Sequence, residues 1–323
     1  MKKTPMIVKL HGGAGNQLFQ LAFALWLRLQ TGDEVRLDEW LIDIPGQGIR
    51  RNCVLEECAA SSLLLPPKNS QWFWNILRGS RLVPPKAAAA VRAVLGINLI
   101  NERELSSYDR QIVNEIGRGR QNIFLGYWQN HRYAGEVRAE LLELLDWKIT
   151  PADACFPSLE HISREQDAVS LHIRRGDYMK LASAPVLGTA YYERAIRAVL
   201  ERLAAQGSGG RSGPRPVTFF VFSDDLAWCR ENVPPLVGSV NDPRFNVSLV
   251  FVEGNDSQAS HKDLCLMRNC GHHILANSTF SWWGAWSNPR TEKVVIAPYP
   301  WMPDRKPVPG LFPGDWITVE SGF

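Results

Sequence analysis

The sequence has no long apolar run, so neither a secretion signal nor a membrane-spanning helix is predicted. The apolar stretch near the N-terminus is interrupted at Lys9, whereas a signal peptide needs roughly 7–15 apolar residues. No later stretch approaches the ~20 apolar residues that cross a bilayer. We therefore expect a cytoplasmic protein without a transmembrane segment, and peripheral association with the inner membrane stays open.

An excess of charge of one sign is also absent. The chain carries 36 basic and 33 acidic residues, a net charge of +3, and its lysines and arginines form no block longer than two residues. Nucleic-acid-binding proteins concentrate positive charge in patches or tails. The sequence therefore indicates no nucleic-acid partner.

Cysteine is too sparse and scattered for a disulfide framework. The six cysteines include two C-x4-C pairs, of which the second precedes His272 and His273. Zinc sites usually space their cysteines more closely, so we interpret these thiols as small buried side chains. The sequence also contains no Asp-x-Asp pair that could chelate a metal. We predict no metal site.

Apolar and aromatic residues are abundant: 45% of the chain is hydrophobic and it holds 12 tryptophans in 323 residues. This composition predicts a folded globular chain, and the length predicts two domains. Trp282 and Trp286 are four residues apart and share one side of a helix, so we expect them to pack in the core with Trp283. Trp128 and Trp301 are left as candidate sugar contacts.

The first half of the chain opens in the manner of a nucleotide-binding α/β domain. A strand is predicted at Met6–Leu10, followed by the glycine turn HGGAGNQ and a helix at Leu18–Gln30. Further strands are predicted at Glu34–Leu37 and Ile123–Gln129, and further helices at Trp72–Leu77, Lys86–Leu95 and Tyr133–Leu145.

Strands and helices alternate regularly in the second half, which predicts a doubly wound, mostly parallel sheet. A break at Thr150–Pro157 separates an N-terminal domain at 1–150 from a C-terminal domain at 158–323. The predicted strands are Ala168–Ile173, Val217–Phe222, Val247–Val252, His273–Ala276 and Lys293–Ala297, and the helices are Tyr191–Gln206, Leu226–Asn232, Ala259–Asn269 and a short helix near Ser281.

Polar residues collect where these strands end, at the edge where parallel sheets bind ligands. Arg174 and Arg175 follow the first strand with side chains on opposite faces, so one can reach the site. Guanidinium groups bind phosphate bidentately, and the helix start near Ser278 favours anions, although capping alone explains one hydroxyl there. Asp224 and Asp225 either cap the next helix or accept hydrogen bonds from a ribose or a base. The sequence thus predicts a polar site that favours an anion, at His172, Arg174, Arg175, Asp177, Ser223, Asp224, Asp225, Glu253, Asn277, Ser278, Thr279, Phe280 and Ser281.

The glycine turn only partly matches the dinucleotide fingerprint G-x-G-x-x-G. Gly13 and Gly15 occupy the first two positions and Asp38 ends the second strand, but Leu18 stands at the third glycine. That position needs a small residue for close packing of the helix. A nicotinamide oxidoreductase is therefore disfavoured and stays a third hypothesis.

Six motifs, HGGAGNQLFQLA, GYWQNHRY, HIRRGDY, AYYERAI, FSDD and NSTFSWWGAW, follow one another in this order. Together they resemble glycosyltransferase family 11, the α-1,2-fucosyltransferases, in its bacterial form. The resemblance runs over residues 7–300 and is weak at 45–120 and 205–216. It implies an α/β fold of GT-B type, with two facing Rossmann-like domains and mostly parallel sheets. The N-terminal domain would serve the acceptor and the C-terminal domain the donor.

The resemblance also implies inverting transfer of L-fucose from GDP-β-L-fucose to O-2 of a galactose. In this chain Arg174 matches the arginine placed on the donor diphosphate, and His172 and Asp177 flank it. The other donor-side residues implied are Arg175, Ser223, Asp224, Asp263, Asn277, Ser278, Thr279, Phe280 and Ser281, and the glycine loop on the acceptor side comprises Gly13, Gly15, Asn16 and Gln17.

The expected catalytic residues are Arg174, Asp177 and His11. Transfer is expected to be metal-independent, with Arg174 and the helix start near Ser281 neutralising the leaving GDP. The base stays open among His11, Asp177 and Glu253. GDP-fucose is a co-substrate, so no cofactor is expected, and the acceptor is a galactose-terminated oligosaccharide or glycolipid such as a lipopolysaccharide repeat unit.

Two further readings remain open. One is a GT-B transferase that uses another nucleotide sugar. The other is a carbohydrate-binding protein without catalysis, which is disfavoured because neutral sugars do not need arginines directed at phosphate.

Overall fold

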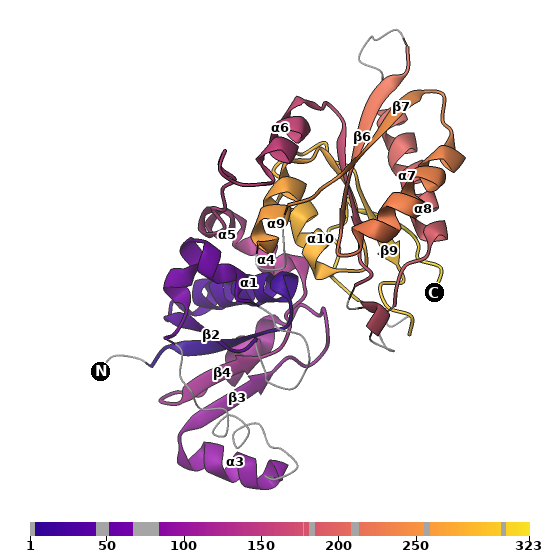
Figure 1. Ribbon diagram of the computed structural model, residues 1–323. Helices are drawn as coiled ribbons and strands as arrows, with labels where there is room; N and C mark the ends of the chain where they lie inside the picture. The colour runs from indigo at the N-terminus through magenta and orange to yellow at the C-terminus, as the bar shows by residue number, and fades with distance from the viewer. Residues whose placement is uncertain are drawn as a thin grey trace. The chain divides into compact units, whose positions relative to one another are not determined.

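The structure, a computed structural model, describes residues 4–42, 52–66, 84–176, 178–180, 185–207, 213–254, 259–304 and 308–323. The chain divides into two compact units (Figure 1). Unit 1 comprises residues 1–146 and 308–312, and unit 2 comprises 147–307 and 313–323. The inclusion of 308–312 in unit 1 is a feature that the sequence did not predict.

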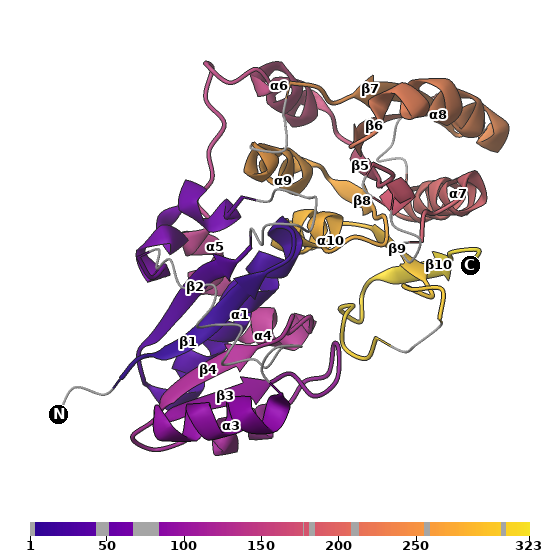
Figure 2. The same ribbon diagram turned by 60° about the horizontal axis from the view of Figure 1, so that its bottom comes forward.

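Unit 1 is built on a parallel four-stranded sheet with the strand order β2-β1-β4-β3. Figure 2 shows these strands with α3 beside β3. Because all four strands run in the same direction, their carboxyl ends meet at one edge. The strands are β1 (Met6–His11), β2 (Val35–Leu41), β3 (Ile97–Asn101) and β4 (Gln121–Leu125), and the helices are α1 (Ala14–Thr31), α3 (Pro85–Val94), α4 (His131–Glu136) and α5 (Arg138–Leu144), with short 3-10 helices at Val54–Glu57, Ala59–Leu63 and Arg110–Glu115.

Helix α1 anchors the glycine turn in unit 1. Every residue from Gln17 to Leu27 is buried, and burial of each large apolar side chain contributes ~1.5–3 kcal/mol. The helix ends at Gly32, whose φ of 67° suits a residue without a Cβ. Phe23 of α1 stacks on Trp128, with 3.9 Å between the ring centroids. The helix therefore fixes the glycine turn and also supports the segment after β4.

Unit 2 is built on a parallel six-stranded sheet with the strand order β10-β9-β8-β5-β6-β7. Val169, Leu171 and Ile173 pack with α7 and α8 on one face of this sheet. Ala168 and Phe220 pack with α6 and α9 on the other face, as the alternation of side chains along a strand requires. The strands are β5 (Ala168–Ile173), β6 (Arg215–Ser223), β7 (Phe245–Phe251), β8 (His272–Ile274), β9 (Val295–Tyr299) and β10 (Ile317–Glu320), and the helices are α6 (Phe156–Arg164), α7 (Thr189–Ala205), α8 (Leu226–Val240), α9 (Ser260–Asn269) and α10 (Thr279–Ser287).

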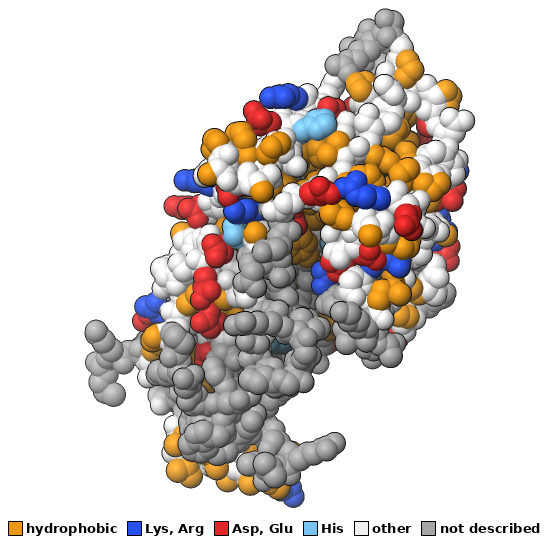
Figure 3. Space-filling view, viewed as in Figure 1, with side chains coloured by type: hydrophobic (Ala, Val, Ile, Leu, Met, Phe, Trp, Pro, Cys, Tyr) orange, Lys and Arg blue, Asp and Glu red, His pale blue; other side chains and the backbone are white. Residues whose placement is uncertain are grey.

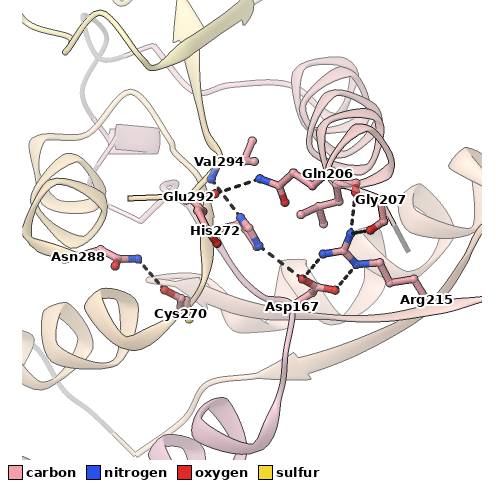
Figure 4. A network of polar contacts seen from close by, with 10 residues as sticks. Asp167, Gln206, Gly207, Arg215, Cys270, His272, Asn288, Glu292 and Val294 are labelled. Atoms are coloured by element: carbon pink, nitrogen blue, oxygen red, sulfur yellow. Dashed lines mark hydrogen bonds and ion pairs between the residues drawn. The ribbon is translucent and has the colours of Figure 1, made fainter. Parts of the chain in front are cut away.

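A buried ionic network joins the amino ends of β5, β6 and β8 (Figure 4). Arg215 donates to both oxygens of the Asp167 carboxylate, at 2.5 and 2.7 Å. His272 Nε2 lies 3.6 Å from Asp167 Oδ1, and its Nδ1 accepts from Val294 N. Burial raises the pKa of Asp167, but hydrogen bonds from His272 and Arg215 outweigh it and hold the pKa at about 2. This network ties three strands together at the edge opposite their carboxyl ends.

Several predicted elements differ from the observed ones. The helix predicted at Tyr133–Leu145 is interrupted at Val137 and forms α4 and α5. The prediction that Lys293–Ala297 is the last strand was wrong, because β10 follows it. Strand β3 was missed, and α8 runs on through Pro234 and Pro235. The helix predicted at 72–77 lies outside the described residues.

Most of the tryptophans that the structure describes are core residues. Trp282, Trp283 and Trp286 pack against one another, and Trp316 joins them at 5.4 Å from Trp282. The interpretation of Trp128 and Trp301 as sugar contacts was wrong, because only 2% and 5% of their surfaces are exposed. A sugar can stack only on an accessible ring face. Most of the described tryptophans therefore serve packing.

Charged side chains of both signs are interspersed on the face shown in Figure 3, in keeping with the small net charge. All six cysteines are free thiols, and five of them are buried. Within the part of the chain that the structure describes, no helix is long and apolar enough to cross a membrane. The same residues contain no group of three His, Cys, Asp or Glu side chains that could hold a metal ion.

Candidate active site

Two arginines leave the carboxyl end of β5 and meet the two aspartates that follow β6. Arg174 Nε lies 3.1 Å from Asp224 Oδ2, and the other oxygen, Asp224 Oδ1, accepts from the backbone N–H of Arg175 at 2.8 Å. The Arg174 side chain is 30% exposed. The contact with Asp224 therefore orients the guanidinium group, a group that binds carboxylates and phosphates through several N–H donors.

Arg175 has different surroundings. Its Nε donates to Asp225 Oδ2 at 3.2 Å, and its guanidinium lies 4.1 Å from the centroid of the Trp228 ring. Asp225 also caps α8 by accepting from Trp228 N. These contacts make Arg175 and Asp225 part of the packing of α8, whereas Asp224 orients Arg174.

Gly176 makes room for the Asp224 carboxylate. A Cβ atom at residue 176 would lie 2.6 Å from Asp224 Oδ2 and 2.8 Å from Asp224 Cγ. These distances are too short for a van der Waals contact, so any residue other than glycine would clash with Asp224. The HIRRGDY motif therefore carries a glycine because Asp224 approaches the backbone there. The next residue, Asp177, lies outside the described residues.

His172 lies in β5, two residues before Arg174, and its imidazole is neutral. The residue is 4% exposed, and among the described residues its Nδ1 has no hydrogen-bond partner. Burial, followed by the nearby charge of Arg174, lowers its pKa to about 3. The ring lies 5.7 Å from Phe280. His172 is thus a buried uncharged imidazole with one unused polar atom beside the arginine.

The segment between β8 and α10 has its polar groups organised by backbone contacts. Ser278 caps α10 by accepting from Phe280 N, and Ser281 Oγ donates to Ser278 O. Asn277 Nδ2 donates to Pro185 O, while its buried Oδ1 has no partner among the described residues. Capping of α10 therefore explains the hydroxyl of Ser278, one of the hydroxyls predicted to bind an anion. Thr279 begins the helix itself, so its backbone and that of Ser281 supply N–H groups of the first turn.

Three further predicted residues, Ser223, Asp263 and Glu253, also lie in unit 2. Ser223 Oγ accepts from Asp225 N at 3.0 Å. Asp263 lies in the first turn of α9. Glu253, one of the candidate bases, forms an ion pair with Arg230 and its side chain is 62% exposed.

In unit 1, the glycine turn follows β1 at the carboxyl edge of the sheet. Gly13 precedes α1 in an extended conformation, and Asn16 Oδ1 accepts from Gln129 Nε2 at 2.9 Å. Gln17 is completely buried: its Nε2 donates to Gly12 O and Asn52 O, and its Oε1 accepts from Val54 N. Gln17 therefore fastens the turn to the following segment. Gly15 is also buried.

His11 and the segment after β4 form a second polar cluster in unit 1. His11 Nε2 and Gln20 Nε2 both donate to Gly126 O, at 3.1 and 3.0 Å. Glu102 accepts from the backbone N–H groups of Tyr127 and Trp128. Glu102 was not predicted as a site residue, because β3, the strand that it follows, was not predicted. With β3 assigned, the position of Glu102 at the carboxyl end of a parallel strand would have indicated it.

Two α/β units with parallel sheets confirm the predicted α/β fold of GT-B type. Residues 97–319 match the model of glycosyl transferase family 11. The chain therefore belongs to this family, and the resemblance found in the motifs is confirmed.

The chain is similar to characterised proteins over different lengths. It is 28% identical to an α-1,2-colitosyltransferase of Escherichia coli, over 98% of this chain and 99% of that protein. It is 28% identical to the O-antigen biosynthesis glycosyltransferase WbnK of E. coli, over 91% of this chain and 93% of that protein. A galactoside α-(1,2)-fucosyltransferase 2 of Mus musculus is 29% identical over 61% of this chain and 54% of its own length.

Proposed function

We propose that the protein transfers L-fucose from GDP-β-L-fucose to O-2 of a galactose residue, with inversion at the transferred carbon. The observation that carries this proposal is the contact between Arg174 and Asp224, which sets a half-buried guanidinium at the carboxyl edge of the unit 2 sheet. Similarity to α-1,2-transferases of bacteria and of a mammal supports the linkage.

The donor diphosphate is the ligand that Arg174 fits. Transfer breaks the bond between the sugar C1 and a β-phosphate oxygen, and the electron pair of that bond remains on GDP. In this proposal Arg174, at the carboxyl end of β5, and the first-turn N–H groups of α10 stabilise this negative charge. Asp224 keeps Arg174 oriented between turnovers, so little reorganisation is needed when charge develops.

A second donor, GDP-colitose, is favoured by one observation. The relative that matches 98% of this chain is an α-1,2-colitosyltransferase, and colitose is L-fucose without the hydroxyl at C3. Both sugars carry the same diphosphate, so Arg174 serves either. The choice depends on whether the site provides a hydrogen-bond partner for that hydroxyl, since an unpaired buried polar group is costly.

The experiment offers GDP-fucose, GDP-colitose, GDP-mannose and UDP-galactose separately to the purified protein with a panel of β-galactosides. Mass spectrometry identifies the sugar added, and linkage analysis identifies the position. A matched 2-deoxygalactoside serves as the control acceptor. Fucose added at O-2 of galactose, with no product from the 2-deoxygalactoside, is expected. Preferred use of GDP-colitose would move the donor assignment to colitose, and transfer from UDP-galactose alone would overturn the proposal.

A further inference from the structure

Unit 2 contains a pocket of about 320 Å³ at the ends of α9 and α10, beside the amino ends of β8 and β9. Arg174 lies at the opposite, carboxyl edge of the same sheet, so the pocket is separate from the candidate donor site. Its volume falls at the lower end of the roughly 300–1,000 Å³ of small-molecule sites. The lining residues are Trp147, Cys265, Arg268, Asn269, Asn288, Pro289 and Arg290.

The charge of the pocket lining is entirely positive. Arg268 and Arg290 carry this charge, and no aspartate or glutamate is among the lining residues. Within the described part of the chain, neither arginine forms an ion pair with a carboxylate. A Cβ atom at Gly271 would lie 2.9 Å from Arg290 Nη1, so the guanidinium group lies close to the backbone there. Two guanidinium groups without a carboxylate partner favour an anionic ligand.

The carbonyls around the two helix ends take hydrogen bonds from other side chains. Asn269 Nδ2 donates to Cys265 O at 2.8 Å. Asn288 Nδ2 donates to Cys270 O at 2.7 Å (Figure 4), and Lys293 Nζ donates to Asn288 O at 3.0 Å. A helix leaves its last carbonyls without partners inside the helix, and arginines often supply them. Here asparagine and lysine side chains do so instead of the two arginines.

A chain of buried polar groups fixes the backbone of Arg290. Asn288 is completely buried, and its Oδ1 accepts from Arg290 N at 2.8 Å. Its Nδ2 lies 2.8 Å from His273 Nε2, while His273 Nδ1 lies 2.8 Å from Ser170 Oγ. Burial lowers the pKa of His273, so the ring is neutral and Nε2 accepts from Asn288. This side of the pocket is therefore formed before a ligand binds, which reduces the entropic cost of binding.

Trp147 contributes an apolar ring and an unused donor to the pocket. Its indole Nε1 is buried and has no hydrogen-bond partner among the described residues. The ring centroid lies 6.3 Å from that of His261, and Cys265 Sγ lies 3.8 Å from Trp147 O. A buried polar group without a partner is costly, so a ligand oxygen that reached this N–H group would remove that cost.

We propose that this pocket binds the phosphate group of a small phosphate compound, with Arg268 and Arg290 as the cationic ligands and the Trp147 N–H as a further donor. One guanidinium group matches a carboxylate bidentately, whereas a phosphate dianion presents three strong acceptor oxygens. Free phosphate leaves part of the volume unfilled. A sugar phosphate has the same charged group and places its sugar beside Trp147 and Pro289, so both sources of the phosphate are tested.

The test measures binding of glucose 6-phosphate, inorganic phosphate and glucose to the full-length protein by isothermal titration calorimetry. The variants Arg268→Gln, Arg290→Gln and Trp147→Phe each keep a side chain of similar size. Arg164→Gln removes an exposed arginine on α6 of the same unit and is the matched control. Arg174→Ala distinguishes the pocket from the donor site. Circular dichroism checks that every variant is folded.

We expect the wild type to bind glucose 6-phosphate and not glucose. Arg268→Gln and Arg290→Gln should each weaken this binding at least about tenfold, because each removes a charge-assisted contact, and Trp147→Phe should weaken it about threefold. Arg164→Gln and Arg174→Ala should bind as the wild type does. Equal affinity for inorganic phosphate would support the site and assign it to the free anion.

Three results would overturn the proposal: no binding of either phosphate compound, unchanged binding in Arg268→Gln and Arg290→Gln, or a loss confined to Arg174→Ala. The measurement records binding to unit 2 and not sugar transfer. Its outcome is therefore independent of whether the proposed function holds.

Discussion

Arg174 Nε lies 3.1 Å from Asp224 Oδ2, and this contact joins the ends of two neighbouring strands in unit 2. It pairs a cation and an anion that are each about one quarter to one third exposed. Such a pair adds little to stability, because water screens it. The contact instead orients Arg174, since the Asp224 carboxylate holds the guanidinium plane in place for an anionic ligand.

Replacement of this arginine is the sharpest test of the donor site. Arg174→Ala should lower kcat by orders of magnitude, because the charge that develops on GDP loses its stabilising cation. The variant should remain folded by circular dichroism. Arg164→Ala removes an exposed arginine that pairs with Glu160 on the same helix and is the control expected to retain activity. A folded Arg174→Ala protein with near-wild-type turnover would contradict the role of this residue.

Gly176 should be intolerant of even a methyl group. In Gly176→Ala the new Cβ would press on the Asp224 carboxylate at 2.6 Å, so Asp224 must move and release Arg174. We expect KM for the donor to rise several-fold and kcat to fall. Gly238→Ala in α8 is the control, because nothing lies within 4 Å of its Cβ, and alanine favours a helix by roughly 0.5–1 kcal/mol. Steady-state kinetics of the two variants should therefore differ, and identical kinetics would contradict the packing argument.

The buried His172 makes stability depend on pH. Burial and Arg174 lower its pKa to about 3 in the folded protein, whereas an unfolded histidine has a pKa of about 6.5. Between these values the unfolded state binds more protons, so the free energy of unfolding falls as pH drops below about 6.5. One proton corresponds to about 1.4 kcal/mol per pH unit. Urea unfolding at pH 5 and 7 should show a smaller difference in His172→Asn than in wild type. An unchanged difference in His172→Asn would oppose the assignment.

Transfer should not depend on a divalent metal. Because Arg174 and the start of α10 are proposed to neutralise the leaving diphosphate, dialysis against a chelator should leave turnover within about twofold of the untreated enzyme. Rates measured in EDTA and after addition of Mg²⁺ or Mn²⁺ check this expectation. A chelator-dependent loss that metal restores would show that a cation shares this role.

Much of unit 2 could be predicted from sequence because its strands are strongly apolar and each is followed by a polar turn. β5 was predicted with its observed bounds. α8 was predicted to end at Asn232, because Pro234 and Pro235 usually mark a helix end, yet both lie inside it. The sequence predicted that Arg174 and Asp224 lie at the same edge of the sheet, because both follow apolar strands.

Unit 1 was harder to predict, and its most informative cluster was missed. β3 reads INLIN, in which apolar and polar residues do not alternate strictly, and the strand is only half-buried, so it gives no clear strand signal. Glu102 was therefore left in an unassigned stretch. In the segment after β4, Trp128 was interpreted as a sugar contact, although its ring is buried against Phe23. Contacts between residues far apart in sequence, such as Glu102 with Tyr127, come only from the folded chain.

The most direct test of the account is the structure of the product formed from GDP-β-L-fucose and a terminal β-galactoside. We expect NMR and methylation analysis to show a single α-linked fucose on O-2 of galactose, with one GDP released per sugar transferred. A product linked at another hydroxyl, a β linkage, or no product from a GDP-sugar while another nucleotide sugar is consumed would contradict it.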